Sequence, residues 1–149
     1  GAARAIAVEL ALAGAASVDI ACRRPEQGRP VAESIRQAAP SVVASVANWQ
    51  GDISVTGDVD IVVNATSVGL GDPNARLAFN VGSLDAEMVV ADVIPNPAST
   101  RFLREAAEVG CRTVDGRGML VNQAAIAVRW WLGIEADTAV MRARLDEVI

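Results

Sequence analysis

The sequence predicts an α/β fold in which a doubly wound parallel sheet carries helices on both faces, a three-layer α/β/α arrangement. Short apolar runs alternate with helical patterns from one end of the chain to the other, and no internal repeat interrupts this order. The run at residues 60–64 (DIVVN) is β-branched at its centre, as expected of a strand that a parallel sheet buries on both faces. Alternating strands and helices of this kind are typical of parallel sheets joined by crossover helices.

The first part of the chain predicts two helices and two strands. In chain order they are a helix at 3–12, a strand at 17–22, a polar helix at about 30–39 and a strand at 41–47. Gly14 is the expected end of the first helix. The segment 23–26 (RRPE) is expected to be a turn, because Pro25 cannot continue a strand.

The second part of the chain predicts three strands and three helices. The strands are expected at residues 60–64, 87–94 and 112–114, and the helices at 100–109, from the glycine-containing turn at 115–118 to about 132, and from 138 to the end. Gly110 and Gly133 are the expected ends of the first two of these helices. Asp137 is the expected N-cap of the last one.

The composition excludes several classes of function. A net charge of -5 and a pI near 4.7 argue against nucleic-acid binding, which needs a basic face, and no apolar run is long enough to cross a bilayer. All thirteen basic residues are arginine, so without His, Lys or Tyr most of the usual acid-base groups are missing. Cys22 and Cys111 cannot form a structural zinc site, and no metal site is expected. We interpret both as small hydrophobic residues in a reducing compartment, the cytoplasm, and a disulfide between them is the alternative.

Ligands bind at the carboxyl ends of the strands in such a sheet, and four segments follow these ends. They are Arg23-Arg24, 65–69, 93–96 and 115–118. If Gly1 is the last glycine of a glycine-rich turn, the helix that follows offers free N–H groups to a pyrophosphate. Arginines directly after the strand at 17–22 would suit the 2'-phosphate of NADP, where an acidic residue would favour NAD. The alternative is an exposed turn on an acidic protein.

The stretch 115–123 (DGRGMLVNQ) leads from a short strand into a helix. Gly116 and Gly118 allow a close backbone approach to a ligand, and Met119 and Gln123 share one face of the expected helix. A buried amide at Gln123 would need a polar partner. The alternative is a pair of turn glycines before an ordinary core helix.

Five segments together resemble the nucleotide-binding half of the shikimate dehydrogenase family. They are GAARAIAVELA, CRRPE, NATSVGLGD, DVIPNPAST and DGRGMLVNQAAIAVRWWLG. The resemblance covers nearly the whole chain and implies a Rossmann-like NADP-binding domain at 1–149 that lacks its first strand. In that family a separate N-terminal domain binds shikimate and supplies a catalytic lysine and aspartate. We therefore expect no catalytic group in this chain, a final helix (137–149) that packs back toward the missing domain, and a homodimer as one possible assembly. The chain alone is expected to be inactive and not stably folded.

The resemblance also implies a role for individual residues. It assigns cofactor contacts to Gly1 and Ala2 (pyrophosphate), Arg23 and Arg24 (2'-phosphate), Thr66, Ser67 and Val93 (along the cofactor), and Gly116, Met119 and Leu120 (nicotinamide). Gln123 falls where the family's glutamine binds a substrate hydroxyl. The implied reaction is reversible hydride transfer between shikimate and NADP, giving 3-dehydroshikimate.

Three positions in two segments depart from the family pattern. Cys22-Arg23-Arg24 stands where Asn-Arg-Thr is usual, and Pro95 stands where many members have a tyrosine that faces the substrate. Quinate, an aminoshikimate or another polyol acid is therefore an alternative substrate. A non-catalytic NADP-binding module is the alternative of a different class. A dehydrogenase of the same architecture that acts on a folate or an amino acid is a third alternative.

Overall fold

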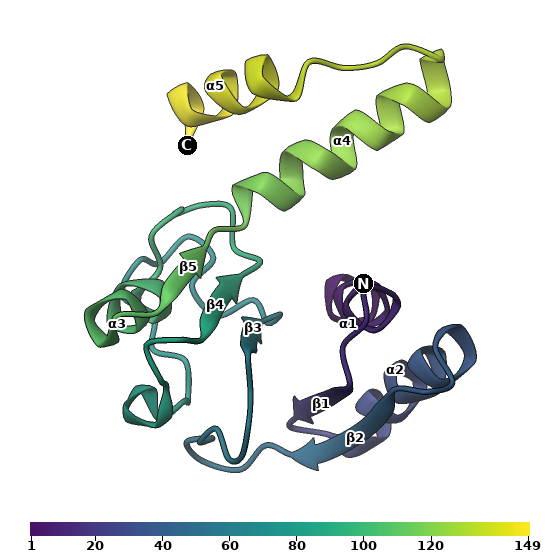
Figure 1. Cartoon of the computed structure of the whole chain (residues 1–149). Helices are drawn as coiled ribbons and strands as arrows, with labels where there is room; N and C mark the ends of the chain where they lie inside the picture. The colour runs from purple at the N-terminus through teal and green to yellow at the C-terminus, as the bar shows by residue number, and fades with distance from the viewer. The chain divides into compact units, whose positions relative to one another are not determined.

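A computed structural model describes residues 1–149 and divides into two compact units, Gly1–Ile53 and Ser54–Ile149 (Figure 1). In chain order the elements are α1 (Ala2–Leu12), β1 (Ser17–Cys22), α2 (Pro25–Ala38), β2 (Val43–Asn48), β3 (Ile61–Asn64), the 3-10 helix η1 (Val81–Ser83), β4 (Val89–Asp92), α3 (Arg101–Val109), β5 (Arg112–Val114), α4 (Arg117–Leu132) and α5 (Thr138–Val148). None of the helices combines the length and the apolar character that a bilayer crossing requires.

The first unit is a two-stranded parallel sheet with both of its helices packed on one face. β1 and β2 pair in register from Ser17 opposite Val43 to Cys22 opposite Asn48. Its core joins Ala7 and Ala11 of α1 to Ile35 of α2, and Val18, Ile20 and Ala44 of the strands pack against this core. Side chains alternate across a strand, so the opposite face of β1 is exposed.

Helix α2 begins earlier than the sequence indicated. Residues 23–26 were expected to be a turn, but Arg24 is the N-cap and Pro25 occupies the first helical turn. The N–H groups of a first helical turn have no acceptor within the helix, so the N–H that proline lacks costs no hydrogen bond there. Gly28 then lets the helix lie close to the sheet: a Cβ there would be 2.7 Å from Val46 Cγ1 and 2.9 Å from Cys22 Sγ. A larger residue at this position would push α2 away from the strands.

The second unit is a three-stranded parallel sheet in the order β3-β4-β5. Helix α3 packs on β4 and β5, and Phe102 of α3 meets Phe79 edge-on with ring centroids 5.4 Å apart. As predicted, α3 ends at Gly110, which adopts a left-handed conformation (φ 104°). The parallel strands and the helices that connect them confirm the predicted α/β class.

The C-terminal helices expose much of their apolar surface. Val121 is the only buried residue of α4, and α5 buries none. Asp137 caps α5 as predicted, because its Oδ1 accepts hydrogen bonds from the N–H groups of Ala139 (2.9 Å) and Val140 (3.1 Å). These two helices pack on each other.

Candidate functional site

The carboxyl ends of β3, β4 and β5 lie at one edge of the second unit's sheet, because the three strands are parallel. Asn64 and Asp92, the last residues of β3 and β4, are opposite each other in the register. The segments that follow these strands are 65–69, 93–96 and 115–118. All three segments that the sequence marked in this half of the chain therefore meet at one edge.

A buried polar network ties the first two segments to the sheet. Asp92 is 3% exposed. Its Oδ1 accepts hydrogen bonds from Asn64 Nδ2 (3.1 Å) and from the N–H of Ile94 (3.0 Å), and its Oδ2 accepts one from Thr100 Oγ1 (2.8 Å). The carboxylate thus links the end of β3, the loop after β4 and the start of α3.

Burial raises the pKa of the Asp92 carboxyl above its ordinary value. The three hydrogen bonds to Ile94, Thr100 and Asn64 act in the opposite direction, since they stabilise the charged form, and they offset only part of the desolvation. Asp92 has no exposed face from which to reach a ligand. We interpret it as a residue that shapes the site.

The predicted cofactor residue Thr66 belongs to the same network. Its hydroxyl donates to Asn64 Oδ1 (2.8 Å) and accepts from the N–H of Val68 (3.1 Å). The side chain therefore holds the loop in shape and has its polar atom already engaged. Ser67, the next residue, is exposed.

Gly116 brings the segments after β4 and β5 into contact. A Cβ at Gly116 would lie 2.4 Å from the carbonyl oxygen of Val93 and 2.6 Å from the carbonyl carbon of Ile94. Only glycine fits there, because a real Cβ does not approach backbone so closely. Two predicted cofactor residues, Val93 and Gly116, are thus neighbours, and the close approach that Gly116 allows is to the protein's own backbone.

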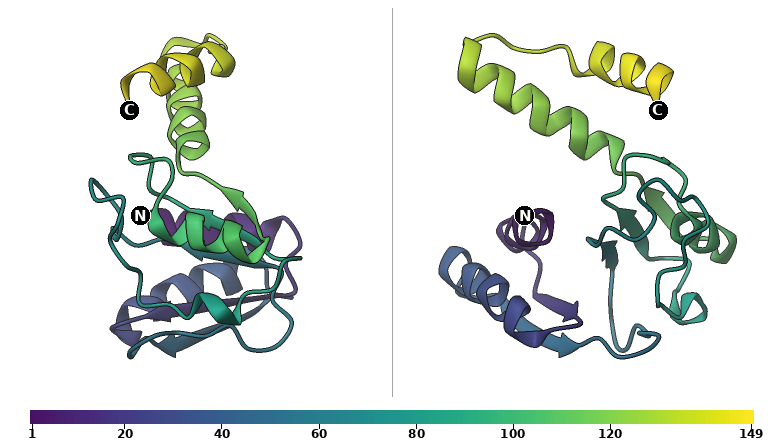
Figure 2. Two further views of the ribbon diagram at one scale, coloured as in Figure 1. Left: turned by 90° about the vertical axis from the view of Figure 1, so that its left-hand side faces the viewer. Right: turned by 180° about the vertical axis from the view of Figure 1, so that it is seen from behind.

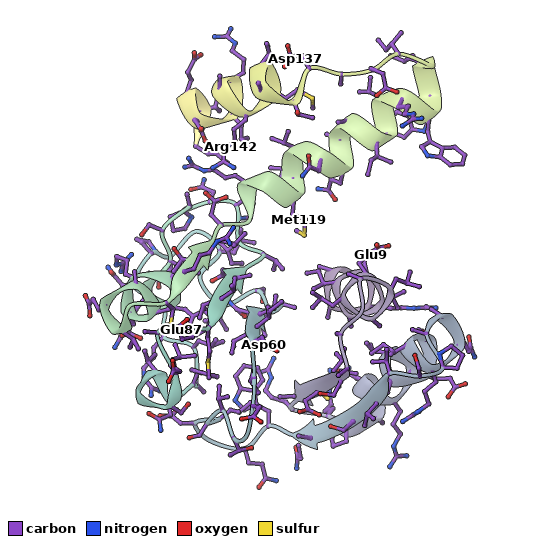
Figure 3. The ribbon with its side chains drawn as sticks, viewed as in Figure 1. Glu9, Asp60, Glu87, Met119, Asp137 and Arg142 are labelled. Atoms are coloured by element: carbon purple, nitrogen blue, oxygen red, sulfur yellow. The ribbon has the colours of Figure 1, made fainter.

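Met119 and Leu120, the predicted nicotinamide contacts, lie near the start of α4. Met119 is 37% exposed and its side chain projects from α4 (Figure 3), while Leu120 is half-buried. Gln123 is exposed. Its amide therefore needs no partner within this chain, because α4 contacts little besides α5 along its length.

The other four predicted residues, Gly1, Ala2, Arg23 and Arg24, belong to the first unit. A tight turn at 13–16 reverses the chain between α1 and β1, so the start of α1 and the end of β1 lie at the same edge of this unit (Figure 2, left). No side chain caps the start of α1. Arg23 and Arg24 are exposed. No hydrogen bond or ion pair within the chain engages either guanidinium.

Three residues that shape the site were not selected from the sequence: Asn64, Asp92 and Thr100. Two of them carried a signal that could have been used. Asn64 and Asp92 are polar side chains at the ends of two strands that are otherwise apolar, and a buried polar group needs partners. That they are partners of each other follows only from the strand register.

The chain is similar to known proteins over its whole length. A family model described as the shikimate 5'-dehydrogenase C-terminal domain matches residues 116–145. A shikimate dehydrogenase (NADP(+)) of Methanococcoides burtonii is 39% identical over 149 residues, which is 100% of this chain and 52% of that protein. The one of Methanocaldococcus jannaschii is 36% identical over 99% of this chain and 52% of its own length. The chain thus spans about half the length of the curated relatives it matches.

Solved structures also match nearly the whole of this chain and about half of their own length. The ligand-free 5-ketofructose reductase of a Gluconobacter strain is 50% identical, with a TM-score of 0.92 over 100% of this chain and 53% of that one. Quinate dehydrogenase of Corynebacterium glutamicum in complex with NAD is 29% identical, with a TM-score of 0.82 over 99% of this chain and 52% of that one. A shikimate 5-dehydrogenase of Thermus thermophilus in complex with NADP(H) and shikimate is 30% identical, with a TM-score of 0.78 over 99% and 52%.

Proposed function

Because the chain belongs to the shikimate dehydrogenase family, whose C-terminal half it matches, we propose that it is the NADP-binding half of an oxidoreductase that interconverts shikimate and 3-dehydroshikimate. The observation that carries the proposal is the junction of Val93 and Gly116 at the carboxyl edge of the second sheet. In a parallel sheet this edge is where a dinucleotide lies.

The residues fit NADP at its two ends. The uncapped start of α1 and the unpaired Arg23 and Arg24 suit an anionic group, and guanidinium groups bind phosphate by charge-assisted hydrogen bonds. In the second unit, the backbone at Val93 and Gly116 with Met119 and Leu120 of α4 would hold the nicotinamide. NADP, when bound, supplies the carbon that accepts or gives the hydride.

This chain's task in the reaction is to orient the two reactants. Gln123 lies one helical turn beyond Met119, and its exposed amide would bind a hydroxyl of the substrate. We assign proton transfer to a lysine and an aspartate of the other half of the protein, because this chain has no His, Lys or Tyr. That half would bind the substrate and cover α4 and α5, whose exposed apolar side chains support an interface there.

A second substrate class is favoured by one observation. The 5-ketofructose reductase is 50% identical to this chain, which exceeds the identity of the shikimate dehydrogenases named above. Pro95, at the position where many family members have a tyrosine, is also consistent with a changed substrate. A ketose carries hydroxyl groups beside its carbonyl, so Gln123 could serve it as well.

Steady-state assays of the full-length protein would decide between these substrates. We expect NADP reduction with shikimate and less with quinate, whereas NADPH oxidation by 5-ketofructose alone would assign the second substrate class. Gln123→Ala should raise the KM of the preferred substrate about tenfold, the size of one lost hydrogen bond to a neutral hydroxyl, and leave NADP affinity unchanged. Asn122→Ala, at the neighbouring exposed position, is the matched control. If the protein is inactive with all of these substrates, the result favours the alternative hypothesis, a non-catalytic NADP-binding module.

Location and assembly belong to the same proposal. We place the protein in the cytoplasm, because both cysteines are free and a reducing compartment keeps thiols in that state. The homodimer stays a prediction, which light scattering of the full-length protein would test.

A further inference from the structure

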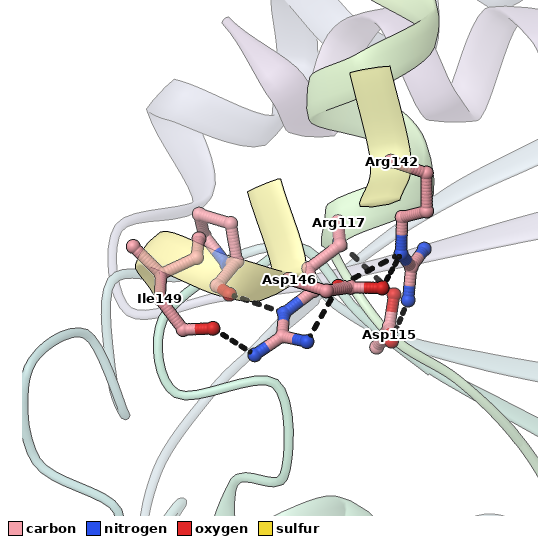
Figure 4. A network of polar contacts seen from close by, with 6 residues as sticks. Asp115, Arg117, Arg142, Asp146 and Ile149 are labelled. Carbon is pink, nitrogen blue, oxygen red and sulfur yellow. Dashed lines mark hydrogen bonds and ion pairs between the residues drawn. The ribbon is translucent and has the colours of Figure 1, made fainter. Parts of the chain in front are cut away.

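A closed ring of polar contacts joins α5 to the turn between β5 and α4 (Figure 4). Arg117 Nη1 donates to Asp146 Oδ1 (2.7 Å), and Arg142 Nε donates to both oxygens of Asp146 (3.1 and 3.2 Å). Arg142 Nη2 donates to Asp115 Oδ2 (2.8 Å), and Asp115 Oδ1 accepts the N–H of Arg117 (3.0 Å), which closes the ring. Two positive and two negative charges alternate around it.

Arg117 has further contacts that an ordinary surface ion pair lacks. Its side chain is only 17% exposed. Nη2 donates to the main-chain oxygen of Ile149 (2.6 Å), and Nε donates to the carbonyl oxygen of Pro95 (3.4 Å). One guanidinium therefore touches α5, the end of the chain and the loop after β4, a set that the five donors of arginine can satisfy.

The ring is also the main polar attachment of α5. No residue of α5 is buried, so apolar packing alone holds it weakly. The ion pair of Arg144 with Glu147 lies within the helix and attaches it to nothing else. Without the ring, α5 would rest mainly on its contacts with α4.

We propose that Arg117 is a positioning residue, through which α5 sets the place of the segment 116–119 against the loop after β4. The inference rests on the proposed function, which assigns this segment to the nicotinamide. Arg117 lies between Gly116 and Gly118, so a shift of its side chain moves the backbone that would touch the cofactor. Arg117 itself does not touch the reacting atoms.

The test uses variants of the full-length protein that break the ring at Asp146, outside the proposed cofactor site. Asp146→Asn removes the charge, Asp146→Glu keeps it, and Arg144→Gln removes an α5 ion pair outside the ring as the matched control. We expect Asp146→Asn to lower kcat between about tenfold and a hundredfold, as misplacement of a reactant does, with the substrate KM within about twofold. Asp146→Glu should restore most of the activity, and Arg144→Gln should match the wild type.

A second readout does not depend on activity. Hydrogen exchange of the amides at 116–120 should become faster in Asp146→Asn, while exchange in α3 stays as in the wild type. If Asp146→Asn does not fold, Arg117→Lys replaces it, because an ammonium keeps the charge and cannot reach Asp146, Ile149 and Pro95 together. Unchanged exchange at 116–120 with unchanged kcat in either variant would overturn the proposal. If the wild-type protein is inactive with every substrate, the proposed function is refuted. The rate of hydrogen exchange at 116–120 in Asp146→Asn then decides this inference by itself.

Discussion

At the scale of single residues, Arg23 and Arg24 have exposed guanidinium groups without any partner in the chain, although the protein is acidic. They follow β1 at the edge where α1 begins. Their position supports binding of the 2'-phosphate that distinguishes NADP from NAD.

Replacing both residues by Gln should weaken NADP binding far more than NAD binding. A hydrogen bond to a charged group contributes about 1.5 to 3 kcal/mol, so each lost contact should lower NADP affinity about tenfold or more. Calorimetric titration of the full-length protein with both cofactors measures the two affinities. Arg29→Gln, which removes an exposed arginine of α2, is the matched control. Equal losses for NADP and NAD would show that the pair does not bind the phosphate.

Asp92 gives a pH-dependent prediction. Its pKa is raised in the folded protein, so between the ordinary carboxyl pKa and the raised value the folded state binds more protons than the unfolded state. Stability therefore falls as pH rises through this window. Asp92→Asn should remove that slope, and because Thr100 loses its carboxyl acceptor it should lower the free energy of unfolding by about 1 to 3 kcal/mol below the window, a deficit that shrinks as pH rises through it.

Urea unfolding at a series of pH values measures both effects. Asp58→Asn, which removes a carboxylate from an exposed loop, is the control and should keep the slope of the wild type. A variant of Asp92 that keeps the wild-type slope would contradict the role of burial.

At the scale of elements, Gly116 and Gly118 look equivalent in the sequence and differ in the structure. A Cβ at Gly116 would overlap the carbonyl of Val93, whereas one at Gly118 would meet only Arg142 Nη1 at 4.0 Å. Gly116→Ala should therefore shift α4 away from the loop after β4 and destabilise the protein by about 1 to 3 kcal/mol. Gly118→Ala should be neutral or stabilise it by up to about 1 kcal/mol, because alanine favours a helix. Thermal unfolding compares the two variants, and equal losses would contradict the contact with Val93.

Most element positions were predictable, because each depends on neighbouring residues. The strand at Ser17–Cys22, the helix end at Gly110 and the cap at Asp137 agree with the patterns that predicted them. The start of α2 was missed because Pro25 can end a strand or begin a helix, and the choice depends on how α2 packs through Gly28. The pairing of Asn64 with Asp92 was not predictable, since it depends on the register of strands 28 residues apart.

At the scale of the whole molecule, the C-terminal helices leave several large apolar side chains uncovered. Trp130 is 83% and Trp131 82% exposed. Exposed aromatic residues in a cluster are typical of an interface. We assign this surface to the half of the protein that the relatives have and this chain does not include.

Tryptophan fluorescence tests this assignment in the full-length protein. With Trp49 replaced by Phe, Trp130 and Trp131 are the two tryptophans of this chain whose fluorescence is measured. Acrylamide should quench them several-fold less than it quenches free N-acetyltryptophanamide, because the other half excludes the quencher. Adding urea should raise the quenching to that of the free compound. Full quenching in the folded protein would mean that nothing covers α4.

The candidate contacts are divided between the two compact units of the chain. The residues proposed for the phosphates all lie in Gly1–Ile53, and those proposed for the nicotinamide and the substrate all lie in Ser54–Ile149. Mutations that change the preferred cofactor and mutations that change the substrate therefore fall on separate cores. A substitution that alters one specificity is therefore expected to leave the packing around the residues of the other unchanged.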